Sequence, residues 1–219
     1  MPKPPAADES VGRMEFLLSL RQRGISDPAV LRAMDEVQRE NFVDEEFSQS
    51  AYADQALPIS CGQTISQPYV VAYMTEQLGL LPHHRVLEVG TGSGYQAAIL
   101  SRLAAQVITV ERYRTLAELA RSRFESLGYA NITVRLGDGL TGVPEFSPYD
   151  RILVTAAAER IPESLTDQLA QDGVIVLPLG PHQEAQRIVK LTKMNGSLKR
   201  EDLIWVRFVP LLPGQAREL

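Results

Sequence analysis

The segment that most constrains the fold is Arg85–Gly94, RVLEVGTGSG, in which a short apolar run passes directly into a cluster of glycines. The helical pattern of Tyr95–Leu103 follows this cluster. Glycines allow a tight turn and a close approach of a ligand to the backbone, and the start of a helix offers free N–H groups. The sequence therefore predicts a strand, a ligand-binding turn and a helix.

Further short apolar runs alternate with helical patterns along the rest of the chain. The additional strands are predicted at Val107–Val110, Ile132–Leu136, Ile152–Thr155 and Val174–Leu177, with a helix at Thr115–Leu127. This alternation is typical of an α/β fold, doubly wound around a mostly parallel sheet. Two last strands, Arg187–Lys193 and Leu203–Leu211, flank a turn at Asn195–Gly196 and are expected to form an antiparallel pair at the sheet edge.

The chain before residue 81 has a different character. Residues 1–10 are interpreted as a disordered lead-in, and residues 11–80 as a helical extension on the substrate side. Residues 81–219 form the predicted cofactor-binding α/β core. Because no long linker divides the chain, we expect 1–219 to be one domain.

Within this extension the pattern of Val11–Ala33 is helical and is broken at Gly24. A further helix is expected from Ser66, with Ser66 as N-cap and Pro68 in the first turn.

Composition and charge exclude several classes of function. A formal net charge of -5 is the wrong sign for broad binding to a phosphate backbone, so nucleic acid is not the expected partner. No apolar run approaches the roughly 20 residues that span a bilayer, and no membrane partner is expected. The single cysteine, Cys61, fits a reducing compartment, so we expect a cytoplasmic protein. The three histidines lack metal-ligand spacing, and no metal site is predicted.

Two acidic residues narrow the choice of ligand. Glu111 ends the second predicted strand, 21 positions after Gly90 (111 − 90), where a carboxylate reaches the hydroxyls of an adenosine ribose. That feature suits both NAD and S-adenosylmethionine. Glu88 lies inside the first strand, where a charge is costly unless it is paired. The ammonium group of a methionine moiety would pair with it, whereas NAD has none; an arginine is the structural alternative.

A third element follows the third strand at Gly137-Asp138-Gly139. An acid there can accept a hydrogen bond from an adenine amino group, although Asp-Gly is also an ordinary turn pair. The predicted cofactor is S-adenosylmethionine, and its predicted binding residues are Glu88, Gly90, Thr91, Gly92, Gly94, Glu111, Asp138 and Gly139.

Two longer motifs resemble one family. Val86–Ala97, VLEVGTGSGYQA, resembles the first motif of the protein-L-isoaspartate O-methyltransferases, and Leu57–Pro68, LPISCGQTISQP, resembles a block more specific to them. Shorter matching segments are Arg39–Val43, Gly137–Gly139, Tyr149–Asp150, Val154–Ala157 and Val206–Leu211. The resemblance runs from about Phe16 to Leu211. This chain departs from the family pattern at Gln38, usually proline, and at Ser60, usually glycine.

The resemblance implies methylation of the free α-carboxylate of L-isoaspartyl residues in damaged proteins and peptides. The ester then closes to a succinimide, which hydrolyses partly to aspartate, so the implied role is protein repair. The resemblance also implies that Ser66 orients the acceptor carboxylate, and Thr64 is placed beside it at the substrate end. A carboxylate is already ionised at pH 7, so positioning and exclusion of water suffice without a strong general base.

Three alternatives remain at this point: another S-adenosylmethionine-dependent methyltransferase, acting on a small molecule or on nucleic acid; an NAD-dependent dehydrogenase; and a non-catalytic binding module. Nucleic-acid amino methyltransferases need an Asn/Asp-Pro-Pro-aromatic turn after the fourth strand, and here that place reads Thr155-Ala-Ala-Ala158. The position of Glu88 disfavours the dehydrogenase. The intact glycine-rich turn, together with Thr64 and Ser66, argues against a module that has lost activity.

Overall fold

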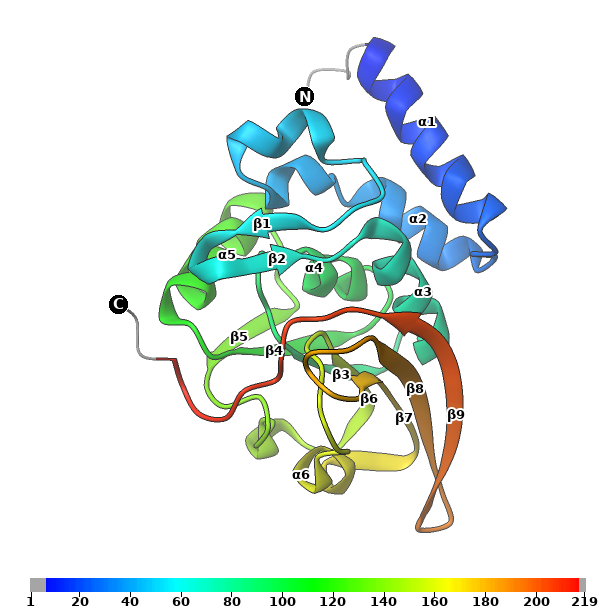
Figure 1. Ribbon diagram of the computed structural model, residues 1–219, viewed down its shortest axis with the longest axis vertical. Coiled ribbons are helices and arrows are strands. Elements are labelled where there is room, and N and C mark those ends of the chain that lie inside the picture. The colour runs from blue at the N-terminus through cyan, green and yellow to red at the C-terminus, as the bar shows by residue number, and fades with distance from the viewer. Residues whose placement is uncertain (1–6, 217–219) are drawn as a thin grey trace.

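The computed structural model describes residues 7–216, which fold around a seven-stranded sheet (Figure 1). Its strands are β3 (Arg85–Val89), β4 (Gln106–Glu111), β5 (Ile132–Leu136), β6 (Tyr149–Val154), β7 (Leu169–Leu179), β8 (Gln186–Met194) and β9 (Ser197–Val206). They lie in the order β5-β4-β3-β6-β7-β8-β9. Strands β3 to β7 pair in parallel and the last two pairs are antiparallel, so the predicted fold class is confirmed.

Side chains alternate between two apolar cores, one on each face of the sheet. Val86 belongs to the core on one face and its neighbour Leu87 to the core on the other. The first core also receives side chains from α3 (Pro68–Leu78), α4 (Tyr95–Ser101) and α5 (Arg114–Leu127). The second receives Leu165 of the short helix α6 (Glu163–Asp167). Both faces are therefore covered, as expected, but one far more heavily.

The N-terminal part forms a cap of helices and a small hairpin beside α3 and α4 (Figure 1). Its elements are α1 (Ala7–Gln22), α2 (Pro28–Glu36), η1 (Arg39–Phe42), η2 (Glu45–Ser50), β1 (Leu57–Ile59), η3 (Ser60–Gly62) and β2 (Gln63–Ile65). Helix α1 begins at Ala7, so the prediction of disorder was wrong for residues 7–10; residues 1–6 lie outside the described part.

The start of α3 differs by one residue from the prediction. Pro68 occupies the first helical position, so Gln67 is the N-cap, with extended dihedral angles of φ -52° and ψ 132°. Ser66 immediately precedes this N-cap, so the expectation that it caps α3 was wrong. None of the helices within residues 7–216 is both long and apolar enough to cross a membrane.

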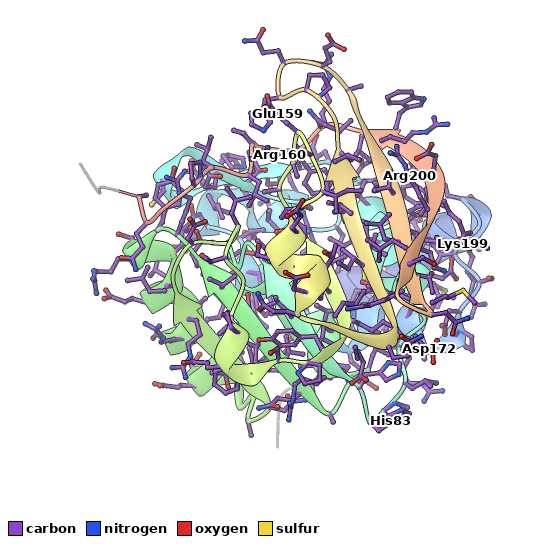
Figure 2. The ribbon with its side chains drawn as sticks, turned by 90° about the horizontal axis from the view of Figure 1, so that it is seen from below. His83, Glu159, Arg160, Asp172, Lys199 and Arg200 are labelled. Atoms are coloured by element: carbon purple, nitrogen blue, oxygen red, sulfur yellow. The ribbon has the colours of Figure 1, made fainter. Side chains whose placement is uncertain are left out.

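The antiparallel pair at the sheet edge is confirmed, with its turn at Asn195 and Gly196, whose φ angles are both positive. Strand β9, however, begins directly after this turn and ends at Val206, so the predicted span Leu203–Leu211 was wrong. The part of β9 that the prediction missed carries charged side chains, as suits the edge strand of a sheet. Figure 2 shows Lys199 and Arg200 along this strand. Charged residues on an edge strand discourage pairing with another chain.

Candidate active site

The glycine-rich turn requires its glycines. Gly90 has φ +99°, and a Cβ atom there would collide with the Oγ1 atom of Thr155. That hydroxyl donates to the carbonyl oxygen of Gly90 at 2.8 Å, which ties the turn to the end of β6. Gly94 has φ +92°, and a Cβ atom would lie 2.7 Å from Cζ of Phe124 on α5. The turn is therefore held close to β6 on one side and to α5 on the other.

A cavity opens beside this turn at the carboxyl ends of β3, β4 and β6, and we call it the turn cavity. Figure 2 shows the direction of the sheet, with His83 before β3 at one end and Glu159 and Arg160, which follow β6, at the other. Seven predicted site residues line the cavity: Thr64, Ser66, Gly90, Thr91, Gly92, Glu111 and Gly139.

Glu111 lies in the cavity wall and also organises the turn. Its Oε2 atom accepts a hydrogen bond from the backbone N–H of Gly92 at 2.9 Å. Its Oε1 atom accepts from the N–H groups of Arg112 at 2.8 Å and Tyr113 at 3.0 Å. A carboxylate offers about four acceptor directions, so these three bonds leave room for a ligand hydroxyl.

Glu88 is fully buried and does not line the turn cavity. Its Oε2 atom accepts a hydrogen bond from the hydroxyl of Thr109, while Oε1 has no partner among the described residues. The Thr109 oxygen lies 2.6 Å from that of Thr91, which does line the cavity. The partner of Glu88 is therefore the hydroxyl group of Thr109, not the arginine considered as an alternative. Burial raises the pKa of Glu88 to about 8.

Asp138 and Gly94 are likewise not among the residues that line the turn cavity. The Oδ1 atom of Asp138 accepts from the N–H of Leu140, and Oδ2 accepts from the N–H of Gly214, both at 2.8 Å. Asp138 thus fastens the C-terminal segment, while its neighbour Gly139 forms part of the wall.

A second hollow, which we call the side groove, adjoins the turn cavity. Its residues are Arg23, Ala56, Thr64, Ser66, Gln67, Tyr69, Val70, Thr155, Ile204, Trp205, Val206, Arg207, Phe208 and Val209. Four of them line both hollows: Thr64, Ser66, Thr155 and Val209. Three hydroxyl-bearing side chains therefore stand where a molecule in the turn cavity would meet one in the side groove.

The C-terminal segment supplies wall residues that sequence reasoning missed. Figure 1 shows it, in red, passing between the β1–β2 hairpin and the carboxyl ends of the central strands. Backbone bonds of 2.8 Å join Ala157 to both Val209 and Leu211. Thr155 was also missed, although its place at the end of a strand next to β3 was a usable signal. Val209 and Leu211 carry no local signal, because only the return of the chain across the sheet brings them there.

The comparisons with known proteins agree with this geometry. The model of the family "Protein-L-isoaspartate(D-aspartate) O-methyltransferase (PCMT)" matches residues 12–216. The protein-L-isoaspartate O-methyltransferase of Rhodopseudomonas palustris (strain BisA53) is 58% identical over 207 residues, 94% of this chain and 96% of that protein.

Two solved structures are also similar. A protein-L-isoaspartate O-methyltransferase has a TM-score of 0.83 at 33% identity, covering 90% of this chain and 65% of that one. A putative enzyme of the same name from Plasmodium falciparum, in complex with S-adenosyl-L-homocysteine, has a TM-score of 0.80 at 28% identity, covering 90% and 97%. The chain described here therefore belongs to the protein-L-isoaspartate O-methyltransferase family.

Proposed function

We propose that this chain carries out the reaction of its family across the two adjoining hollows: methylation of the free α-carboxylate of L-isoaspartyl residues. S-adenosylmethionine, when bound, supplies an electrophilic methyl group. The observation that carries the proposal is the shared wall, in which Thr64, Ser66 and Thr155 line both the turn cavity and the side groove. A donor against the turn and an acceptor in the groove would meet at these residues.

The residues of the turn cavity fit the cofactor. Gly90, Thr91, Gly92 and Gly139 let it approach the backbone, and Glu111 has remaining capacity to accept from ribose hydroxyls. The Oε1 atom of Glu88 is unpartnered but lies outside the lining of the turn cavity, so the predicted pairing of Glu88 with the ammonium group stays a prediction.

Two other residues predicted to bind the cofactor, Gly94 and Asp138, do not line the turn cavity. Gly94 lets the turn lie close to Phe124, because a Cβ atom at this position would collide with the phenyl ring. The direct bond predicted from Asp138 to the adenine amino group stays a prediction, since both its oxygens hold backbone N–H groups.

The acceptor side needs orientation rather than a base. A carboxylate with an ordinary pKa is ionised at pH 7, so it would need no base to take the methyl group from the sulfonium, whose S–CH3 bond electrons would return to sulfur. We assign Ser66 and Thr64 as the hydroxyl groups that donate hydrogen bonds to the carboxylate oxygens and align one of them. The side groove continues past these residues to Tyr69 and Trp205, which gives room for a polypeptide and favours isoaspartyl proteins and peptides over a small molecule.

Transfer of labelled methyl groups tests this function. We expect label on a synthetic isoaspartyl peptide and none on the matching aspartyl peptide, with the ester lost later through a succinimide. Equal labelling of both peptides, or labelling only of small carboxylic acids, would contradict the proposal.

We also propose that residues 1–219 act as one domain in the cytoplasm. The N-terminal helices share a core with the sheet, since Leu20 and Val86 belong to the same apolar cluster. The single cysteine, Cys61, supports a reducing compartment.

A further inference from the structure

Arg39 is a buried cation held without an acidic partner. Its side chain is completely buried, and its guanidinium group makes no salt bridge within residues 7–216. The neighbouring Glu40 carboxylate accepts instead from the hydroxyl of Tyr52. The Arg39 guanidinium carbon lies 5.0 Å from the ring centre of Tyr95, a favourable contact for a cation. Burial lowers the pKa of Arg39 to about 10, so the group remains charged at pH 7.

Backbone carbonyl groups satisfy the Arg39 side chain instead. Nε donates to the carbonyl oxygen of Ala51 at 2.7 Å, Nη1 to that of Ser66 at 2.9 Å, and Nη2 to that of Gln55 at 3.4 Å. Two of these carbonyl groups lie at the ends of residues 51–66, the segment that carries Thr64 and Ser66, and that of Gln55 lies within it. The Arg39 side chain therefore ties the two ends of this segment together, and one of its bonds is to Ser66, the residue assigned to orient the acceptor.

We propose that Arg39 is a positioning residue for methyl transfer: it fixes the Ser66 peptide unit and provides an unneutralised positive charge behind the acceptor site. The inference rests on the proposed function. A buried charge without a counter-ion is costly, and an anionic acceptor arriving nearby would repay part of that cost.

The two roles act on different kinetic constants. Transfer neutralises the acceptor carboxylate, so a positive charge favours the bound substrate and not the transition state. Loss of the charge should therefore raise KM for the peptide. Loss of the bond to Ser66 misplaces the hydroxyl and should lower kcat.

The test compares Arg39→Lys and Arg39→Met with the same changes at Arg151. Arg151 is a matched control, because it also donates to backbone carbonyl groups, those of Leu78 at 2.6 Å and Gly79 at 3.2 Å. These lie at the far end of α3, about 15 Å along the helix from its start. Each variant is measured for melting temperature, cofactor Kd by calorimetry, and KM and kcat for an isoaspartyl peptide.

For Arg39→Met we expect a KM about tenfold higher and a kcat about tenfold lower, with the cofactor Kd within about twofold of wild type. For Arg39→Lys, which keeps the charge, KM should stay near wild type while kcat falls. The Arg151 variants should lower the melting temperature only. Unchanged KM and kcat in a folded Arg39→Met variant, or an equal loss of cofactor affinity, would overturn the inference.

Two controls complete the design. If Arg39→Met does not fold, Arg39→Lys decides: a lower kcat at normal cofactor Kd supports the inference, and wild-type kcat overturns it. A wild-type protein that binds the cofactor but does not methylate the isoaspartyl peptide refutes the proposed function itself, so the two failures are distinguishable.

Discussion

The hydroxyl oxygens of Thr91 and Thr109 lie 2.6 Å apart and connect the wall of the turn cavity to the buried carboxyl group of Glu88. Because Thr109 donates its only proton to Glu88, its oxygen accepts from the hydroxyl of Thr91. The protonation of Glu88 is thereby linked to a residue that a bound cofactor would touch.

Glu88→Gln should reduce the pH dependence of stability in the cofactor-free protein. The pKa of Glu88 is raised from 4.5 to about 8 in the folded chain, so between these values the folded state keeps a proton that the unfolded state has released. The stability that this retained proton gives the folded state is present in full below pH 4.5. Above that pH the free energy of unfolding falls by roughly 1 kcal/mol per pH unit, up to about pH 8. Urea unfolding at several pH values compares the slopes, and parallel curves for both proteins would exclude the raised pKa.

Glu111→Ala should weaken cofactor binding by ~1–3 kcal/mol, because charged hydrogen bonds to ribose hydroxyls are lost. It also removes the acceptor of the Gly92 N–H, so a loosened turn should add to the effect. Calorimetric titration with S-adenosylmethionine measures it. Glu118→Ala, at an exposed position on α5, is the control and should bind normally. Normal affinity in a folded Glu111→Ala protein would remove Glu111 from the site.

Ser66→Ala should lower kcat for the isoaspartyl peptide while cofactor affinity stays near wild type. Since Gln67 is the N-cap, we expect little loss of stability. Ser66→Asp should be worse, because a second carboxylate repels that of the substrate. Ser60→Ala, at an exposed position between β1 and β2, serves as the control. A fully active Ser66→Asp enzyme would end the assignment of Ser66 to the acceptor.

Trp205 should report directly on peptide binding. It is the single tryptophan, it lines the side groove, and 64% of its surface is exposed. The guanidinium of Arg187 lies 4.6 Å from its ring centre and holds one face. Titration with isoaspartyl peptide should change its fluorescence, and Trp205→Ala should raise KM severalfold while Trp205→Phe largely retains it. If the fluorescence does not respond although the peptide is methylated, the substrate follows another path.

The parts of the site that local pattern encodes were predictable. The glycines at 90, 92 and 94 and the acid at 111 follow apolar strands, and parallel strands end at the same edge of a sheet. Ser66 was wrongly predicted to be the N-cap of α3. Serine favours the cap position, but proline favours the first helical position, so Pro68 places the N-cap at Gln67. The first half of β9 was missed because it is exposed and shows no alternation of apolar and polar residues.

Other features depend on contacts that no local pattern shows. Arg39 meets Ser66 across 27 positions, and Gly214 meets Asp138 across 76. Such contacts arise only from the complete path of the chain.

The strand order has a consequence for how the protein folds. Strand β3 lies between β4, the next strand in the chain, and β6, whose Arg151 pairs with Val86 from 65 positions away (151 − 86). Long-range pairing of this kind forms slowly. An intermediate folded only as far as β5 would contain the glycine-rich turn and Glu111 but lack Thr155 against Gly90. We therefore expect cofactor binding to appear in the last kinetic phase of refolding, and not with the early formation of helices.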